Sequence, residues 1–237
     1  MNVNVNVNAN SLLHFSPKMS ILCGMDKQMP PARQQRSRDT EERLLNAALQ
    51  ILEEEGLDAA LIPRIAELAQ VAPASVYRRF ADKSALLRAA FLKVLRSSNE
   101  SNQAQAAQKI SRTSLAESLG QMATQLLEQY RAYPHLLRAL MRFMESDSDT
   151  GFVQDAREIM RMNVELMVDL LMRHRTEVRH TPKRSAVHFA VTGMACTIQS
   201  YTLDQESLWH GAAAMTDEEM AARAAHCAYA YLATPLQ

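Results

Sequence analysis

Residues 65–83 read IAELAQVAPASVYRRFADK. Two short helices are predicted around this stretch, one over 62–69 and one from Pro73 to near Phe80, joined by a three-residue turn at 70–72. The apolar side chains expected to lock the two helices together are those of Ile65, Leu68, Ala69, Val71, Val76 and Phe80. Two short helices joined by so short a turn predict a helix-turn-helix unit.

Longer helices are predicted on both sides of this unit. Upstream, Asp39 as N-cap and Glu42 three residues later give a capping signal for a helix over roughly 40–55, which Gly56 ends. Downstream, Asp82 is expected to cap a longer amphipathic helix. The helix-turn-helix is therefore expected within a three-helix domain.

The composition of the whole chain favours an all-α protein. It contains six glycines and 5% aromatic residues, and β-branched residues are sparse. Three cysteines make an odd count without metal-ligand spacing, and no run of 18 apolar residues or secretory leader pattern occurs. We therefore expect a cytoplasmic protein without disulfides, metal or cofactor. No nucleophile or acid-base arrangement suggests an enzyme.

Charge is unevenly distributed, although the formal net charge is zero. Residues 1–98 carry 13 Lys or Arg against 10 Asp or Glu, whereas residues 99–237 carry 13 against 16. Over 62–96 the imbalance grows to seven basic residues against two acidic ones. Such a local positive field favours phosphate binding.

Nucleic acid is the predicted partner of the basic segment. The residues expected to contact DNA are Arg33, Arg36, Arg64, Pro73, Ala74, Ser75, Tyr77, Arg78, Arg79 and Lys83. Arg78 or Arg79 can bind guanine or phosphate in bidentate fashion, and Lys83 is placed for a phosphate. The arm with Arg33 and Arg36 can follow the backbone or enter the minor groove. Isolated arginines are usually solvated surface charges, but this clustering favours DNA contact.

The C-terminal half is predicted to be helical almost throughout. Its last two helices, about 183–203 and 216–232, are Ala-rich and apolar on more than one face, which favours burial between subunits. The residues suggested for a ligand pocket are Met122, Leu126, Met141, Met144, Met160, Asn163 and Met167. Plain core packing remains an alternative for each methionine. Asn163 either bonds another helix or awaits a ligand.

The segment of about residues 39–96 resembles the TetR family of transcriptional regulators. The resemblance rests on Ile-Ala-Glu at 65–67, Tyr-Arg-Arg-Phe at 77–80 and Lys83, in the order and spacing of that family. Three places depart from the family pattern, one of them Ala60-Leu61, which lacks the Thr or Ser expected before the first of the two short helices. Gln70 stands where a turn glycine is usual, and Ala72 replaces the Ser or Thr cap of the recognition helix.

The resemblance implies a DNA-binding regulator with two functional parts. Residues 1–31 are expected to form a disordered tail, 32–98 the helix-turn-helix domain, and 99–237 a helical ligand-sensing and dimerisation domain. The homodimer would place two recognition helices in successive major grooves of a palindromic operator, and a small molecule would release this repressor from DNA. The alternatives are a helical ligand-binding protein with a degenerate helix-turn-helix and an enzyme housed in the C-terminal half.

Overall fold

The computed structural model describes residues 32–108, 114–204 and 214–235, and every regular element within these ranges is a helix. The predicted all-α fold is confirmed, whereas the predicted tail at 1–31 lies outside the described residues. In chain order the helices are α1 (Ala32–Glu54), α2 (Ile62–Leu68), α3 (Pro73–Tyr77), α4 (Lys83–Gln108), α5 (Leu115–Ala132), α6 (Pro134–Ser146), α7 (Thr150–Leu171), the 3-10 turn η1 (Met172–His174), α8 (Lys183–Leu203) and α9 (Asp217–Ala233).

Helix α1 begins about two turns before its predicted start. The prediction that Asp39 is the N-cap was wrong, because Asp39 lies inside the helix and its carboxylate accepts a hydrogen bond from Gln35 at 2.8 Å. The sequence of residues 33–38 is RQQRSR. Arg and Gln are good helix formers, so the helix extends through this segment toward the N-terminus. The predicted end is correct, since Gly56 has a φ of 83° and its N–H donates to the Ile51 carbonyl.

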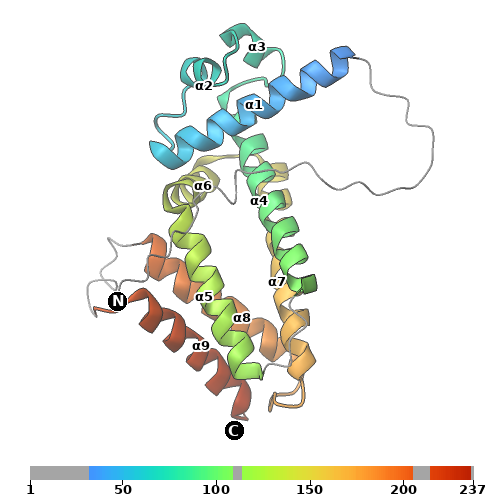
Figure 1. The fold of residues 1–237 in the computed structure, drawn as a ribbon, viewed down its shortest axis with the longest axis vertical. Coiled ribbons are helices and arrows are strands. Elements are labelled where there is room, and N and C mark those ends of the chain that lie inside the picture. The colour runs from blue at the N-terminus through green and yellow to red at the C-terminus, as the bar shows by residue number, and fades with distance from the viewer. Residues whose placement is uncertain (1–31, 109–113, 205–213, 236–237) are drawn as a thin grey trace, which may run out of the picture.

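A first hydrophobic core holds the helix-turn-helix against the rest of the molecule. Helices α1–α3 form one end of the molecule, and α6 lies next to α1 (Figure 1). The core contains side chains from α1, α2, α4 and α6 together with Phe152 of α7. Within it the ring centroids of Phe91 and Phe143 lie 5.3 Å apart, and those of Phe143 and Phe152 lie 5.6 Å apart. The helix-turn-helix end therefore shares its core with α6 and α7.

A second core lies at the opposite end of the molecule. Helices α5, α7, α8 and α9 contribute its buried residues. The bounds of α8 and α9 agree with the predicted ranges to within a residue. Helix α7 is 22 residues long, with Asp149 as its N-cap. The helical periodicity of the C-terminal half was therefore a reliable guide to its elements.

Helix α4 connects the two ends. It begins beside α1 and packs along α7 (Figure 1), running without a break across the predicted domain boundary at residues 98 and 99. A movement of α4 relative to the second core would therefore also displace α1. None of the helices in the described part of the chain is long and apolar enough to cross a membrane.

Candidate nucleic-acid interface

The turn between α2 and α3 has the compact form that the sequence predicts. Gln70 adopts a φ of 56°, the left-handed conformation that glycine takes most easily. The N–H of Gln70 donates to the Glu67 carbonyl and that of Val71 to the Ala66 carbonyl, both at 2.9 Å. The chain therefore completes the turn without a glycine.

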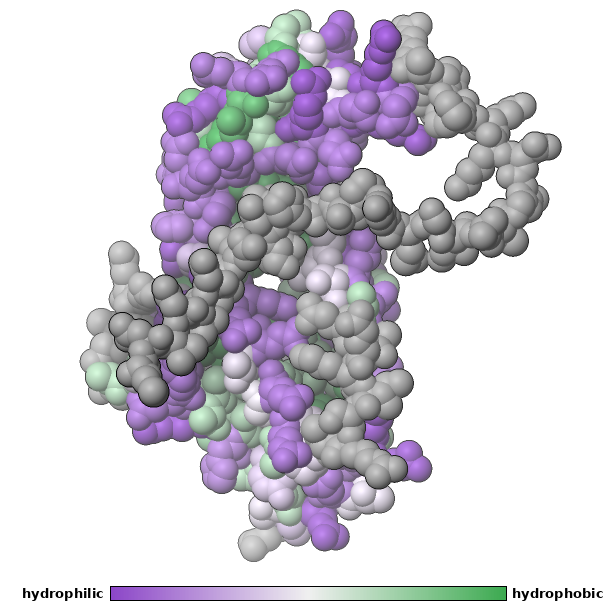
Figure 2. All heavy atoms as spheres, viewed as in Figure 1, coloured by the Kyte–Doolittle hydropathy of each residue, from purple (hydrophilic) through white to green (hydrophobic). Residues whose placement is uncertain are grey.

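The inner faces of the two short helices differ from prediction at Leu68. Ile65, Ala69, Val76 and Phe80 are buried as predicted, but Leu68 is 43% exposed. At 100° per residue the buried face formed by Ile62, Ile65, Ala66 and Ala69 is centred about 110° from Leu68, so the prediction of Leu68 as an inner residue was wrong. With exposed Leu61 it contributes to the apolar surface over α2, among mostly hydrophilic residues (Figure 2).

Helix α3 is shorter than predicted, because it ends at Tyr77 and not near Phe80. Pro73 occupies its first turn, and Ala72 is the N-cap and makes no side-chain cap bond. Pro73 and Ala74 are exposed, and Tyr77 is 60% exposed. Val76 and Phe80 point inward and hold the helix on the core. Of the residues predicted to face outward, Pro73, Ala74 and Tyr77 are therefore exposed on α3.

Arg78 and Arg79 differ in environment although they are adjacent. Arg78 is exposed, and its Nη2 donates to the Ser75 hydroxyl at 2.7 Å. Arg79 is half-buried, with Nη1 donating to the Ser75 carbonyl at 3.0 Å and Nη2 to the Ser37 hydroxyl at 3.5 Å. The Nε of Arg79 is enclosed without a partner. Arg79 therefore ties α3 to α1, whereas Arg78 can turn outward.

Several cations at this end have no carboxylate partner within the described residues. Arg36, Arg78, Arg79 and Lys83 make no ion pair there, while Arg64 pairs with Glu55, the residue that follows α1. Lys83 opens α4, whose first turn is capped by Asp82 through the N–H of Ala85 at 2.7 Å. The side chain of Arg33 lies outside the described residues. Uncompensated cations are the charge pattern that phosphate binding requires.

Sequence reasoning missed the polar contacts that join the DNA-binding end to α6 and α7. The Glu53 carboxylate accepts the N–H of Leu136 at 2.8 Å, and burial raises the pKa of Glu53. Arg88 of α4 donates to both Asp147 oxygens, at 2.7 and 2.9 Å, and also contacts Asp149. The hydrogen bond from Arg88 lowers the pKa of Asp147. These partners are far apart in sequence, so no local pattern could reveal them.

The residues suggested for a ligand pocket do not come together in one place. Met122 and Met167 pack against the second core, in which Leu126 is buried, whereas Met144 packs against the first core. Met141 and Met160 are exposed. Asn163 is 7% exposed and accepts a hydrogen bond from Asn102 at 3.2 Å. Of the two interpretations left open for Asn163, bonding to another helix is therefore the one observed.

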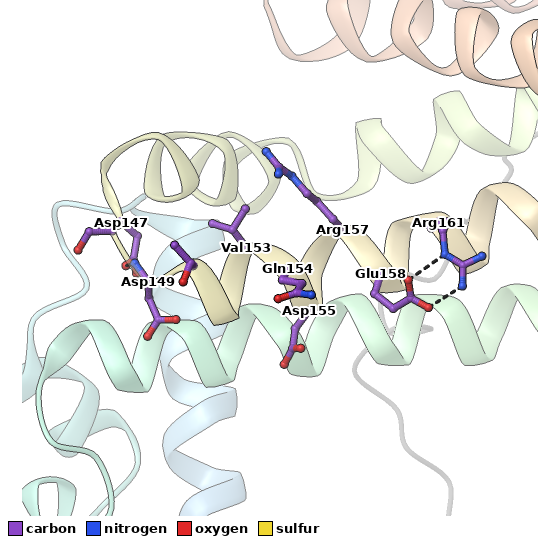
Figure 3. Close-up of a pocket in the computed structure, with 10 residues that line it drawn as sticks. Asp147, Asp149, Val153, Gln154, Asp155, Arg157, Glu158 and Arg161 are labelled. Atoms are coloured by element: carbon purple, nitrogen blue, oxygen red, sulfur yellow. Dashed lines mark hydrogen bonds and ion pairs between the residues drawn. The ribbon is translucent and has the colours of Figure 1, made fainter.

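A surface hollow beside the start of α7 contains none of these suggested residues. Its lining comes from the α6–α7 connection and one side of α7, and includes Asp147, Asp149 and Arg157. Asp149 and Asp155 point to one side of α7 and Arg157 to the other, while Glu158 and Arg161 pair with each other (Figure 3). The hollow is therefore open and carries charges of both signs.

Ser118, His174 and Glu177 form a cluster that sequence reasoning did not anticipate. The Ser118 hydroxyl lies 3.0 Å from Nε2 of His174, and a Glu177 oxygen lies 3.6 Å from Nδ1. The same carboxylate accepts the N–H of Leu115 at 3.2 Å, so it caps the start of α5. The cluster therefore ties α5 to the segment that follows α7.

Comparison with known proteins agrees with this architecture. Residues 44–90 match the model of the bacterial regulatory proteins of the tetR family. No curated protein matches the chain. These 47 residues contain α2, the turn, α3 and the start of α4, and they include Arg78, Arg79 and Lys83, whereas Arg36 lies outside them.

Solved structures share the fold over most of the chain. A putative TetR-family regulator from Mesorhizobium loti is 16% identical with a TM-score of 0.65, covering 84% of this chain and 97% of its own. FadR from Bacillus subtilis, solved with stearoyl-CoA, is 14% identical with a TM-score of 0.55, covering 83% and 99%. A transcriptional regulator from Rhodococcus sp. RHA1 is 20% identical with a TM-score of 0.55, covering 81% and 95%. The helix-turn-helix segment at residues 44–90 is thus similar to the tetR family of bacterial regulatory proteins, and the chain shares the fold of the solved TetR-family regulators.

Proposed function

We propose that this TetR-family DNA-binding regulator is a homodimeric repressor that a small molecule releases from a palindromic operator. The observation that carries the proposal is the exposed face of α3, where Tyr77 and Arg78 project beside cations without carboxylate partners. A recognition helix with such a face can enter the major groove.

The geometry supports distinct roles for the basic residues. Arg78 needs to give up only one bond to Ser75 before its guanidinium can bind guanine O6 and N7. Arg36 and Lys83 are assigned to phosphates, because they flank α3 on α1 and α4. Arg79 holds α3 in place, and Arg64 shares its charge with Glu55. We therefore expect Arg78 to matter most for sequence preference.

The outward face of α8 and α9 is assigned to the dimer. Phe189 is 64% exposed on α8, and Gly193 and Cys196 follow on the same side. Ala230 and Cys227 are exposed on α9, and neither cysteine is in a disulfide. Small residues on this surface allow two copies to pack closely, and Arg223, one turn before Cys227, pairs with Glu219 at 3.6 Å. This arrangement supports a four-helix interface formed by α8, α9 and their symmetry partners.

Release from DNA is assigned to movement of α4. This helix contacts α1 at one end and α7 along its length, and the first core links both. A ligand that favours another position of α4 would change the separation of the two recognition helices, which must match successive major grooves about 34–36 Å apart. The ligand needs only a higher affinity for the non-binding spacing. The solved complex of FadR with stearoyl-CoA supports a ligand-responsive function.

An electrophoretic mobility shift assay on the DNA flanking the gene tests this function. We expect saturable binding that resists excess nonspecific competitor and weakens between 50 and 200 mM salt, by more than about tenfold. Arg78→Ala should abolish competitor-resistant binding, whereas Arg161→Ala, which removes an exposed arginine far from α3, should leave it unchanged. Weak nonspecific binding alone would favour the ligand-binding protein with a degenerate helix-turn-helix.

A further inference from the structure

Helix α2 exposes a large apolar side chain at each of its ends. Leu61, the N-cap of α2, is 53% exposed, and Leu68, its last residue, is 43% exposed. Seven positions separate them, which is nearly two helical turns, so both lie on one side of the helix. Of the large apolar side chains exposed on described residues, only these two and Tyr77 belong to the helix-turn-helix. Tyr77 is part of the face assigned to DNA, whereas the two leucines have no role in that function.

The charges around the two leucines do not suit DNA. Arg64 lies between them in the sequence, but its charge is paired with Glu55. Glu67 is exposed on α2 and makes no ion pair within the described residues. The surface around the leucines therefore carries one more carboxylate than it has cations, and it would repel a phosphate backbone. An apolar surface with such a rim is typical of contact with protein.

The order of side chains along the exposed side of α2 is self-complementary. From the N-terminal end they are Leu61, Arg64, Glu67 and Leu68. Two copies of α2 packed antiparallel about a two-fold axis bring Leu61 of one copy beside Leu68 of the other, and Arg64 beside Glu67. Arg64 can keep its bond to Glu55, because a guanidinium has five N–H donors. Each copy therefore offers both halves of the contact, and the excess carboxylate gains a cation.

The position and size of α2 show where such a contact can form. Helices α8 and α9 lie at the opposite end of the molecule (Figure 1), so a dimer paired through them leaves α2 uncovered. Helix α2 has seven residues and is about 10 Å long. The area it can bury falls well below the roughly 800 Å² per partner of a stable interface. The contact therefore needs a second tether, which one DNA duplex supplies when it holds two dimers side by side.

We propose that the face of α2 formed by Leu61, Arg64, Glu67 and Leu68 joins neighbouring dimers on DNA, by packing antiparallel against the same face of a second dimer. The proposal rests on the DNA-binding function proposed above and adds a second protein interface to it. Burial of the leucines stabilises the second dimer only where the first is already bound. Binding to adjacent operators is therefore cooperative.

Mobility shift titrations on DNA with two sites test the contact. The DNA carries two tandem copies of the segment that the protein protects in a footprint of the region flanking its gene. The distance between the two centres is changed in single base-pair steps over one helical turn, and DNA with one copy is the reference. We expect the second dimer to bind at least about tenfold more tightly than the first at one spacing. The gain should vanish half a turn away, at about 5 base pairs, because the two faces then point to different sides of the duplex.

Leu61→Asn and Leu68→Gln should each abolish this gain and leave the affinity for one-site DNA unchanged. Asparagine suits an N-cap that at present makes no side-chain bond, and glutamine is a good helix former, so α2 should still fold. Met162→Gln removes an exposed apolar side chain from α7 and should keep the gain. A gain that persists in both leucine variants, or no gain at any spacing, would overturn the proposal.

Sedimentation velocity without DNA separates the α2 contact from the function on which it rests. At high protein concentration the dimers should associate weakly into tetramers, and Leu68→Gln should remove this association. Failure of the unmodified protein to bind one-site DNA would contradict the regulatory function. Specific binding to one-site DNA by dimers that never associate, on DNA or in solution, would contradict the α2 contact alone.

Discussion

Gln70 shows how a single residue can meet a backbone requirement that usually calls for glycine. Its φ of 56° lies in the left-handed region, where a side chain crowds the following carbonyl oxygen. The two backbone hydrogen bonds of the turn and the burial of Ile65 and Val76 on either side hold it there. The helix-turn-helix therefore keeps its geometry at a local cost in free energy.

Replacing Gln70 with glycine should stabilise the protein. Relief of the left-handed strain, offset by the greater freedom of glycine in the unfolded chain, should raise the free energy of unfolding by about 1 kcal/mol. Calorimetry should show a Tm about 2–4 °C higher. Gln70→Ala keeps a Cβ atom and serves as the control. An equal gain in the alanine variant would show that strain at φ is not the cause.

At the scale of elements, the contact between α4 and the α6–α7 connection is a polar link beside the first core. Arg88 donates twice to Asp147, whose side chain is 3% exposed, and contacts Asp149 at 3.1 Å. Its neighbours Phe91 and Phe143 supply the apolar part of the same junction. Such a pair fixes the angle of α4 as well as contributing to stability.

Asp147→Asn should lower the free energy of unfolding by about 2 kcal/mol at pH 7, because it removes a charged partner from a buried hydrogen-bonded pair. The hydrogen bond from Arg88 holds the folded pKa of Asp147 below its ordinary value of 3.8, so its contribution is present above that pH and is lost as pH falls through the folded pKa. Urea denaturation should therefore show the two proteins converging below about pH 4.

Glu158→Gln is the matched control for that experiment. Glu158 pairs with Arg161 on the surface of α7, where more than half of each side chain is exposed. Solvent screens such a pair, so its loss should have little effect at pH 7. If Glu158→Gln lowered the free energy of unfolding as much as Asp147→Asn does, the bond from Arg88 would not be the cause of the loss in Asp147→Asn.

At the scale of the whole molecule, the proposed function depends on two copies of the fold holding α3 at a fixed spacing. Within one copy, the first core and α4 connect the DNA-binding end to the helices around the second core. Between copies, the spacing depends on the surface assigned to α8 and α9. A substitution there should therefore affect DNA binding without touching α3.

Ala230→Glu should convert the proposed dimer to a monomer. A carboxylate on the assigned face would lose its hydration on burial, and we expect dimer affinity to fall by at least about tenfold. Sedimentation velocity measures the change, and affinity for a palindromic operator should fall with it. Ala116→Glu, on the exposed side of α5, makes the same chemical change away from that face. A dimer that survives Ala230→Glu would place the interface elsewhere.

Local sequence signals determined most of the elements of this protein. The bounds of α2, α8 and α9, the glycine at the end of α1 and the apolar positions Val76 and Phe80 follow from helical periodicity, capping residues and proline, which act within a few residues along the chain. The order of Ile-Ala-Glu, Tyr-Arg-Arg-Phe and Lys83 was likewise sufficient to indicate the family.

Only the tertiary structure decided which side chains of those elements are exposed and which residues they contact. Leu68 is exposed, Arg79 donates to Ser37 of α1 while the exposed Arg78 donates to Ser75, and Arg88 bonds Asp147, 59 residues away in the sequence. The suggested ligand-pocket methionines separate into two cores and the surface, and Asn163 joins Asn102. Each outcome depends on which helix faces which, and that is set by packing between distant segments, which the periodicity of a single helix does not encode.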